Sequence, residues 1–249
     1  MTRAGLIRLA LILGALLALE WACRYGFISR EAVIPPTVML QGAWRALASE
    51  ETRGEILWTL QNVALSLVLS LIVGTAAGLL LHKATRLRRA LDPLLASYYA
   101  VPTFVFYPLF IVLFGLGRGA IVAIGFLFGV VAMIIATLNG FDRIPRVLLR
   151  TAKVHHMSPA ATALLIKLPS AVPYLFTGIK LAIAYCFIGV IAAEFIMASS
   201  GLGYAISYAF NNFENGTMYA LMLFVIVLVT IVNALFYGYE RHLLRRWGR

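Results

Sequence analysis

Four stretches of this 249-residue chain contain no charged residue at all. They cover residues 56–81, 93–115, 119–139 and 215–239, and each exceeds the ~20 apolar residues that a helix needs to cross a bilayer. The whole chain is 62% hydrophobic and 12% charged, with a mean hydropathy of +0.91, a composition far from that of a soluble globular domain. The sequence therefore predicts an all-α integral membrane protein.

Two further stretches are predicted to span the membrane although each contains charged residues. Residues 6–22 include Arg8 and Glu20, whereas residues 173–197 include Lys180 and Glu194. Together with the four uncharged stretches they give six transmembrane helices. We expect residues 1–249 to form a single transmembrane domain.

The distribution of Lys and Arg predicts how these helices are oriented. If both termini are cytoplasmic, 16 of the 21 Lys and Arg residues lie in cytoplasmic segments and five lie outside. The asymmetry predicts a multi-pass protein with both termini in the cytoplasm. It also accounts for the net charge of +11 without a nucleic acid, because the basic residues flank the membrane, where anionic lipid is the expected partner.

Small residues recur four apart in two of the predicted spans. Gly74 and Gly78 lie in the second span, and Gly125 and Gly129 lie in the fourth. This spacing lets helix backbones approach closely in lipid. Packing within the chain and contact with a second chain are both compatible with it.

The segment between the first two spans predicts an amphipathic helix at the outer surface of the membrane. It begins after two prolines and carries apolar residues at helical spacing, namely Val38, Leu40, Trp44 and Leu47. Two roles are compatible with such a helix, sealing the outer rim of the bundle and receiving an external protein.

Prolines interrupt the third predicted span. Pro102 and Pro108 remove backbone donors from a stretch rich in aromatic residues, and irregular backbone at membrane depth occurs only against protein or a water-filled path. Glu194 is the acid placed deepest in a span, and either lines such a path or accepts bonds from the Ser- and Gly-rich turn that follows it. The candidate residues for a translocation path are Tyr99, Pro102, Thr103, Phe106, Glu194, Ser199 and Ser200.

A long polar segment lies between the fourth and fifth spans, at residues 150–167. Because charges are costly inside a bilayer, it must lie in water or against another protein. Ser158 followed by Pro159 predicts a helix start there, since Ser is a favoured N-cap and Pro is tolerated at the first helical position. The preceding turn would fall on His155 and His156.

The end of this segment resembles the cytoplasmic signature of the permease subunits of binding-protein-dependent ABC importers, in the nitrate, sulfonate and taurine branch. That signature is Glu-Ala-Ala, three residues, Gly, nine residues and Ile-x-Leu-Pro. With Ile166, Leu168 and Pro169 set on its end, Thr151 and Ala152 fall on the two alanines. Arg150 stands in place of the glutamate and His156 in place of the glycine.

The resemblance implies that residues 150–167 are a coupling segment that docks on a separate ATP-hydrolysing subunit. The implied contact residues are Arg150, Thr151, Ala152, His155, His156, Ser158, Pro159, Leu168 and Pro169. It further implies an external solute-binding protein, which the outer segments of this chain would help to receive. A second copy of the chain or a homologous permease would complete the complex, and its location would be the bacterial inner membrane. The solute would be small and polar, as nitrate, a sulfonate, taurine or a related organic compound is.

The chain itself carries no phosphate-binding Gly-x-x-x-x-Gly-Lys-[Ser/Thr] loop, so ATP and Mg²⁺ are expected only on the partner subunit and we predict no enzymatic activity and no cofactor here. A serine protease is disfavoured because the four histidines map to the side opposite Ser200. Adjacent histidines without Cys or acidic companions also predict no metal site. An ion-coupled secondary carrier remains the alternative, disfavoured by the single acid within a span.

Overall fold

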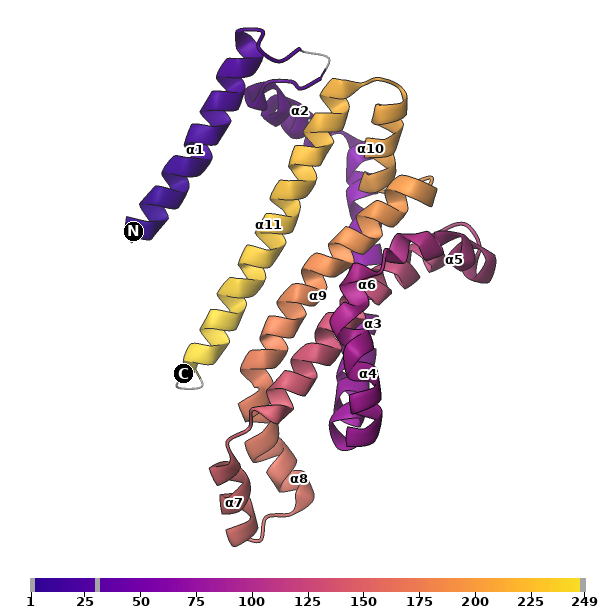
Figure 1. Ribbon diagram of the computed structural model, residues 1–249. Helices are drawn as coiled ribbons and strands as arrows, with labels where there is room; N and C mark the ends of the chain where they lie inside the picture. The colour runs from indigo at the N-terminus through magenta and orange to yellow at the C-terminus, as the bar shows by residue number, and fades with distance from the viewer. Residues whose placement is uncertain (1–2, 30–31, 247–249) are drawn as a thin grey trace.

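The computed structural model describes residues 3–29 and 32–246, and the regular structure in these ranges is entirely helical (Figure 1). The side chains of residues 3–5, 8–9 and 244–246 lie outside this description. The first half of the chain forms α1 (Arg3–Arg24), α2 (Pro36–Ala48), α3 (Glu50–Lys83), α4 (Thr85–Ser97), η1 (Tyr98–Ala100), η2 (Thr103–Phe106), α5 (Tyr107–Phe114) and α6 (Arg118–Asp142). The second half forms α7 (Arg146–Val154), α8 (Pro159–Thr162), the π-helical turn η3 (Ala163–Lys167), α9 (Leu168–Met197), α10 (Leu202–Asn211) and α11 (Asn215–Arg246).

Four helices are long and apolar enough to cross a membrane, and they coincide with four of the expected spans. They are α3, α6, the continuous helix Pro159–Met197 and residues Asn215–Leu243 of α11. A fifth span results if Thr85–Ala100 and Thr103–Phe114 are counted together. The first expected span, 6–22, lies within the 22-residue α1.

The third expected span, 93–115, is not a straight helix. The chain bends by 94° between its two arms, and α5 points away from the bundle (Figure 1). The bend falls at Pro102, whose ring removes the backbone N–H that would continue the helix. The sequence predicted an interruption here, but not a turn of nearly a right angle.

The core of the protein is a bundle of α3, α6 and α9. Its central cluster joins Val63 of α3, Ile121 and Ile124 of α6, and several side chains of α9, including Phe187 and Val190. In α6, 61% of the most apolar window is buried, compared with 17% in α11. Among the four long helices, α6 is therefore the most deeply buried.

Glycines in α6 allow this close packing. A Cβ on Gly129 would lie 2.5 Å from Cys186 Sγ and 2.7 Å from Ser70 Oγ, so no side chain fits there. Gly74 of α3 likewise packs on Met133 of α6. The two glycine pairs seen in the sequence thus serve packing within the chain, one of the two possibilities that their spacing allowed.

Several polar groups of the core helices are paired within the bundle. The Ser70 hydroxyl donates to its own helix at Ser66 O, 2.7 Å away, and lies 3.1 Å from Phe126 O of α6. Lys180 of α9, one of the two charges expected in the fifth span, forms a 2.6 Å ion pair with Glu240 of α11. Polar contacts therefore join α3 to α6 and α9 to α11.

The outer helices form a second, smaller cluster. Ala43 of α2 packs with Leu202 and Ile206 of α10 and with Leu221 and Phe224 of α11. The α2 helix is the amphipathic helix expected after the two prolines. By contrast, α1 stands apart from α11 in Figure 1 and is tied to the start of α2 where Glu20 Oε2 accepts from the Thr37 backbone N–H at 3.0 Å.

Candidate functional site

The polar segment between α6 and α9 forms a helix, a tight turn and a second helix at one end of the molecule (Figure 1). The α7 helix starts at Arg146, so Arg150 lies in its middle rather than at its beginning. It closes with two backbone bonds, from His156 N to Lys153 O at 3.1 Å and from Met157 N to Ala152 O at 2.9 Å. This is the Schellman pattern, which reverses a chain immediately after a helix.

His156 occupies the left-handed position of that turn, with φ of +48°. In the importer signature this position is a glycine, which reaches such angles without the Cβ clash that costs other residues about 1–2 kcal/mol. The chain therefore keeps the geometry of the glycine turn although it carries a histidine there.

Replacing His156 with glycine should relieve this strain without moving the turn. We expect the Met157 amide, which donates to Ala152 O, to exchange its hydrogen about fivefold more slowly, corresponding to about 1 kcal/mol of local stability. Hydrogen-exchange mass spectrometry on the purified protein would measure this. His155→Gly is the matched control, because His155 has an ordinary φ of −82°. Slower exchange of the Met157 amide in His155→Gly would contradict the argument, and so would an unchanged exchange rate in His156→Gly.

The second helix begins as the sequence predicted. The Ser158 hydroxyl accepts a bond from Ala161 N at 3.2 Å, and Pro159 occupies the first helical position. The helix extends well beyond residue 167, the end of the polar segment, because α8 continues through η3 into α9 as one helix, Pro159–Met197. Pro169 offers no N–H to continue the α-helical bonding, and the Leu168 N–H instead reaches back to Ala163 O in the wider π pattern.

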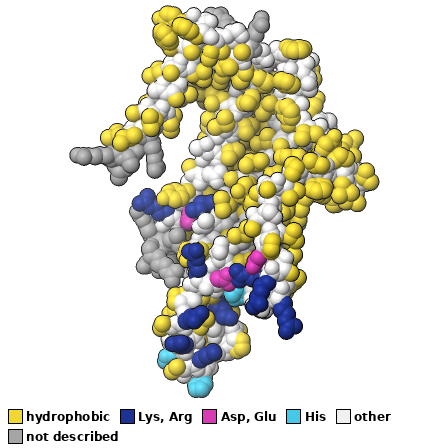
Figure 2. Space-filling view, viewed as in Figure 1, with side chains coloured by type: hydrophobic (Ala, Val, Ile, Leu, Met, Phe, Trp, Pro, Cys, Tyr) yellow, Lys and Arg dark blue, Asp and Glu magenta, His cyan; other side chains and the backbone are white. Residues whose placement is uncertain are grey.

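Most of the predicted contact residues lie on the surface of this helix pair. Exposed members of the set are Arg150, Thr151, His155, His156, Ser158, Pro159 and Leu168, while Pro169 is half-buried. Ala152 is the exception, at 3% exposure, because it packs inside the helix pair. Apolar side chains are exposed alongside them, including Val147, Val154 and Leu165. The tip of the molecule thus presents a mixed apolar and basic surface (Figure 2).

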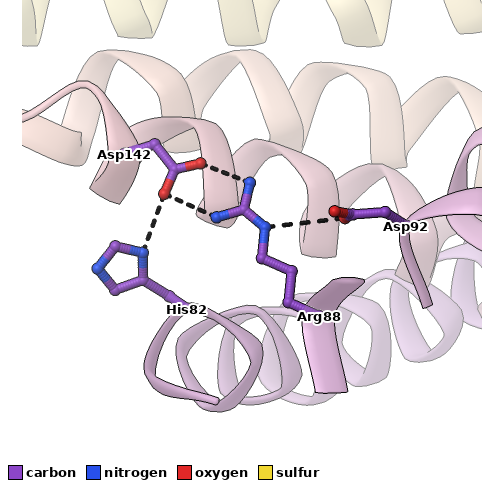
Figure 3. A network of polar contacts seen from close by, with 4 residues as sticks. All are labelled: His82, Arg88, Asp92 and Asp142. Atoms are coloured by element: carbon purple, nitrogen blue, oxygen red, sulfur yellow. Dashed lines mark hydrogen bonds and ion pairs between the residues drawn. The ribbon is translucent and has the colours of Figure 1, made fainter. Parts of the chain in front are cut away.

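A network of charged side chains lies at the base of this helix pair (Figure 3). Asp142, the last residue of α6, accepts two bonds from Arg88 of α4: Nη1 to Oδ1 at 2.9 Å and Nη2 to Oδ2 at 2.6 Å. His82 of α3 approaches Asp142 Oδ1 through Nδ1 at 3.1 Å, and Asp92 lies 3.7 Å from Arg88 Nε. Three helices therefore converge on one carboxylate.

The aromatic candidates of the third span lie at the bend. Tyr99 is partly exposed and stacks on Tyr185 of α9, with ring centroids 4.6 Å apart. Pro102 and Phe106 are also exposed, whereas Thr103 is buried at 6% exposure. The bend thus presents aromatic groups on the surface of the single chain, with Thr103 turned inward.

Glu194 is fully buried in a hydrogen-bond network. Its carboxylate accepts from Thr59 Oγ1 at 2.8 Å, from Asn62 Nδ2 at 3.2 Å and from Gly203 N at 3.2 Å. Thr59 in turn accepts from Leu202 N at 2.8 Å. The carboxylate therefore joins α9 to α3 and to the start of α10.

The two serines after Glu194 lie elsewhere. Ser199 and Ser200 line a cavity of about 180 Å³, together with Trp58 of α3 and Gly117 at the start of α6. The structure thus separates the serines, which reach open space, from Glu194, which does not. It does not gather the seven path candidates into one site within the described chain.

Several residues of these networks escaped the sequence analysis. Thr59 and Asn62 begin a polar series that continues through Ser66 and Ser70 at helical spacing, so this stripe was visible in the uncharged second span. No such signal marks His82, Arg88 and Asp142, which are brought together from positions 54 to 60 residues apart.

Comparison with known proteins identifies the family. Residues 66–249 match the model of the binding-protein-dependent transport system inner membrane component. The nitrate import permease protein of Leptolyngbya laminosa is 28% identical over 82% of this chain and 76% of its own length. The bicarbonate transport system permease protein of a Synechocystis strain is 32% identical over 68% of this chain and 57% of its own.

The fold has a solved counterpart. An inward-facing structure of the MetNI methionine ABC transporter superposes with a TM-score of 0.65 and 17% sequence identity, over 83% of this chain and 96% of that one. Such identity supports a shared fold and nothing finer. Together with the family match over residues 66–249, the apolar helices and the signature at the end of the polar segment, it leads to one conclusion: this chain belongs to the family of binding-protein-dependent transport system inner membrane components, as a permease subunit of an ABC importer.

Proposed function

We propose that the helix pair at residues 150–167 is the surface on which a separate ATPase subunit docks. The observation that carries this proposal is the exposed apolar and basic tip, with Val154 at 74% and Leu165 at 69% exposure beside Arg150 and Lys153. Val154 lies outside the long helices, and Leu165 precedes the expected span 173–197, so these exposed apolar side chains have no protein to cover them within the described chain. A subunit that binds and hydrolyses ATP with Mg²⁺ would cover them and would transmit its movement through α7 and α8.

Six spans with both termini cytoplasmic complete the proposed arrangement. The layout adds α1 and the bent pair to the four long helices, and places the docking tip in the cytoplasm. The positive-inside pattern of the sequence supports it, and in Figure 2 the Lys and Arg side chains gather over the half of the molecule that carries the tip. Residues 1–249 would then form one permease domain of the inner membrane.

The translocation path would lie between this chain and a second copy or a homologous permease. The exposed aromatic groups at the bend, Tyr99 and Phe106, would face it, and Ser199 and Ser200 would lie towards its outer end. A solute-binding protein would deliver the solute from outside. Nucleotide-driven closure of two ATPase subunits would then shift the pair from outward to inward access.

The expected solute is small and polar. Relatives are named for nitrate and bicarbonate import, which favours a small oxyanion, a sulfonate or a related organic compound. Family membership also favours the importer over an ion-coupled secondary carrier. The two differ in their energy source, because uptake by such a carrier would follow an ion gradient rather than ATP.

Crosslinking tests the docking proposal directly. We expect the tagged chain, purified gently from its native membranes and crosslinked, to be joined through residues 150–167 to an ATPase subunit that mass spectrometry identifies. A chain found alone, or only with itself, would count against an importer and for an ion-coupled carrier.

Reversing one charge on the tip should weaken that complex. Arg150→Glu places a negative charge in the middle of exposed α7, and we expect about tenfold less ATPase to co-purify, because a partner surface matched to Arg150 would repel it. Membrane insertion should be unchanged, since Arg150 lies outside the spans. Arg89→Glu on α4 is the control. Equal co-purification of the Arg150 and Arg89 variants would move the contact elsewhere.

A further inference from the structure

A short, partly buried link joins α6 to α7, the first helix of the proposed docking surface. The docking tip means that surface, residues 150–167. Only residues 143–145 separate Asp142 from the first residue of α7, and Ile144 among them is 7% exposed. Arg143 N also continues the bonding of α6 by donating to Asn139 O at 3.2 Å. A displacement of α7 would therefore reach α6 at Asp142.

By contrast, α4 is loosely attached to the rest of the described chain. None of its thirteen residues is buried, and its apolar side chains Leu87 and Leu94 are 52% and 63% exposed. Ala84, with φ of −94° and ψ of 71°, interrupts the backbone between α3 and α4. The α4 helix is thus separated from α3 by an irregular residue at its start. At its other end it continues directly into the aromatic bend at Tyr98–Ala100 and Pro102.

The contact between α4 and the docking end of α6 is the Arg88–Asp142 pair (Figure 3). Two parallel N–H···O bonds fix the direction of the guanidinium as well as its distance, which a single ammonium contact does not do. Asp92, one turn along α4, lies 3.7 Å from Arg88 Nε. On the other side of the pair, His82 of α3 contacts the Asp142 carboxylate. The pair is thus oriented from both sides.

We propose that Arg88 and Asp142 transmit the movement of the docking tip to α4 and so to the aromatic bend. Arg88 is a positioning residue: it touches neither solute nor ATPase but sets where α4 lies when α7 moves. The inference rests on the proposed docking at residues 150–167, and it assigns to α4 the link between that surface and the path.

Partial solvent exposure separates this role from a purely structural one. The side chains of Arg88 and Asp142 are 27% and 33% exposed, and ion pairs at such positions contribute little to stability. Loss of the pair should therefore leave the protein folded. What it should remove is the dependence of α4 on the state of the docking tip.

Two reporter cysteines would measure that dependence in the complex purified with its ATPase. Ala90→Cys places a thiol on exposed α4, and Val154→Cys places one on the docking tip. The native Cys23 and Cys186 are 1% and 0% exposed, so they do not compete for a maleimide. The rate of maleimide labelling would be compared between nucleotide-free protein and protein trapped with ADP and vanadate.

We expect trapping to change the labelling rate of both reporters by about fivefold in the otherwise unaltered chain. With Arg88→Gln added, the change at Val154→Cys should persist while the change at Ala90→Cys disappears. Arg88→Lys keeps the charge but not the two-point contact, and should give an intermediate change. Arg86→Gln, a neighbouring residue of α4 with no ion pair among the described residues, should behave as the unaltered chain.

The outcomes separate the two claims. If Val154→Cys does not respond to trapping, the docking proposal fails. If it responds while Ala90→Cys is silent in the unaltered chain, or still responds fully with Arg88→Gln, then Arg88 does not transmit the movement. If Arg88→Gln yields no complex, Arg88→Lys decides: an undiminished response at Ala90→Cys would overturn the inference.

Discussion

Replacing Glu194 with leucine should destabilise this protein by at least about 3 kcal/mol. The substitution removes the acceptor of three donors, on Thr59, Asn62 and Gly203, in a place that no solvent reaches. Each buried donor left without a partner costs about 1–3 kcal/mol. The start of α10 would also be loosened, because Leu202 N donates to the Thr59 hydroxyl that Glu194 orients.

The midpoint of thermal unfolding in detergent, followed by fluorescence size-exclusion chromatography, would measure the loss. Glu214→Leu is the matched control, since Glu214 is an exposed acid at the start of α11. A structural role predicts a low midpoint for Glu194→Leu and a normal one for Glu214→Leu. A normal midpoint for Glu194→Leu with lost solute uptake would instead make Glu194 a residue of the path.

Replacing Gly129 with leucine should be comparably damaging, for a steric reason. The first carbon of the new side chain would already overlap Cys186 Sγ and Ser70 Oγ, so α6 must separate from α9 and α3. Overpacking of this kind costs about 1–3 kcal/mol where the neighbours can yield, and more where backbones must move. We expect the folded monodisperse fraction after extraction to fall at least about tenfold.

Gly238→Leu is the control, because a Cβ at Gly238 in α11 meets nothing within 4 Å. A smaller pair of changes sharpens the test. Gly129→Ala alone should lower the unfolding midpoint, and adding Cys186→Ala, which removes the nearer of the two obstructing atoms, should restore part of it. Independent effects of the two substitutions would mean that the helices do not pack as described.

Features encoded in one short stretch were predictable from the sequence. The Ser158 cap, the turn at His155 and His156 and the start of α2 at its prolines all depend on residues within about five positions. Three of the four uncharged stretches also correspond to long helices, α3, α6 and α11, because a bilayer leaves a spanning backbone few alternatives.

Features that depend on how helices are rotated against each other were not predictable. Whether Gly129 faces a helix of its own chain or another chain is decided by that rotation, as is the pairing of Glu194 with Thr59 across 135 residues. The bend at Pro102 was expected, but its size depends on the packing of the aromatic side chains around it, such as Phe104 on Phe128. The continuation of α8 into α9 was missed because the break at Pro169 is absorbed as a π turn.

The distance in sequence between Thr59 and Glu194 has a consequence for how the protein is made. At about 5–20 residues per second, 135 residues take about 7 to 27 s to synthesise, and α3 leaves the ribosome that long before its acceptor exists. Ser66 and Ser70 can bond to their own helix in the meantime, but Asn62 cannot complete its contact with Glu194. During that interval the Asn62 amide has no carboxylate to donate to, so the polar contacts of α3 are completed only after α9 has been synthesised.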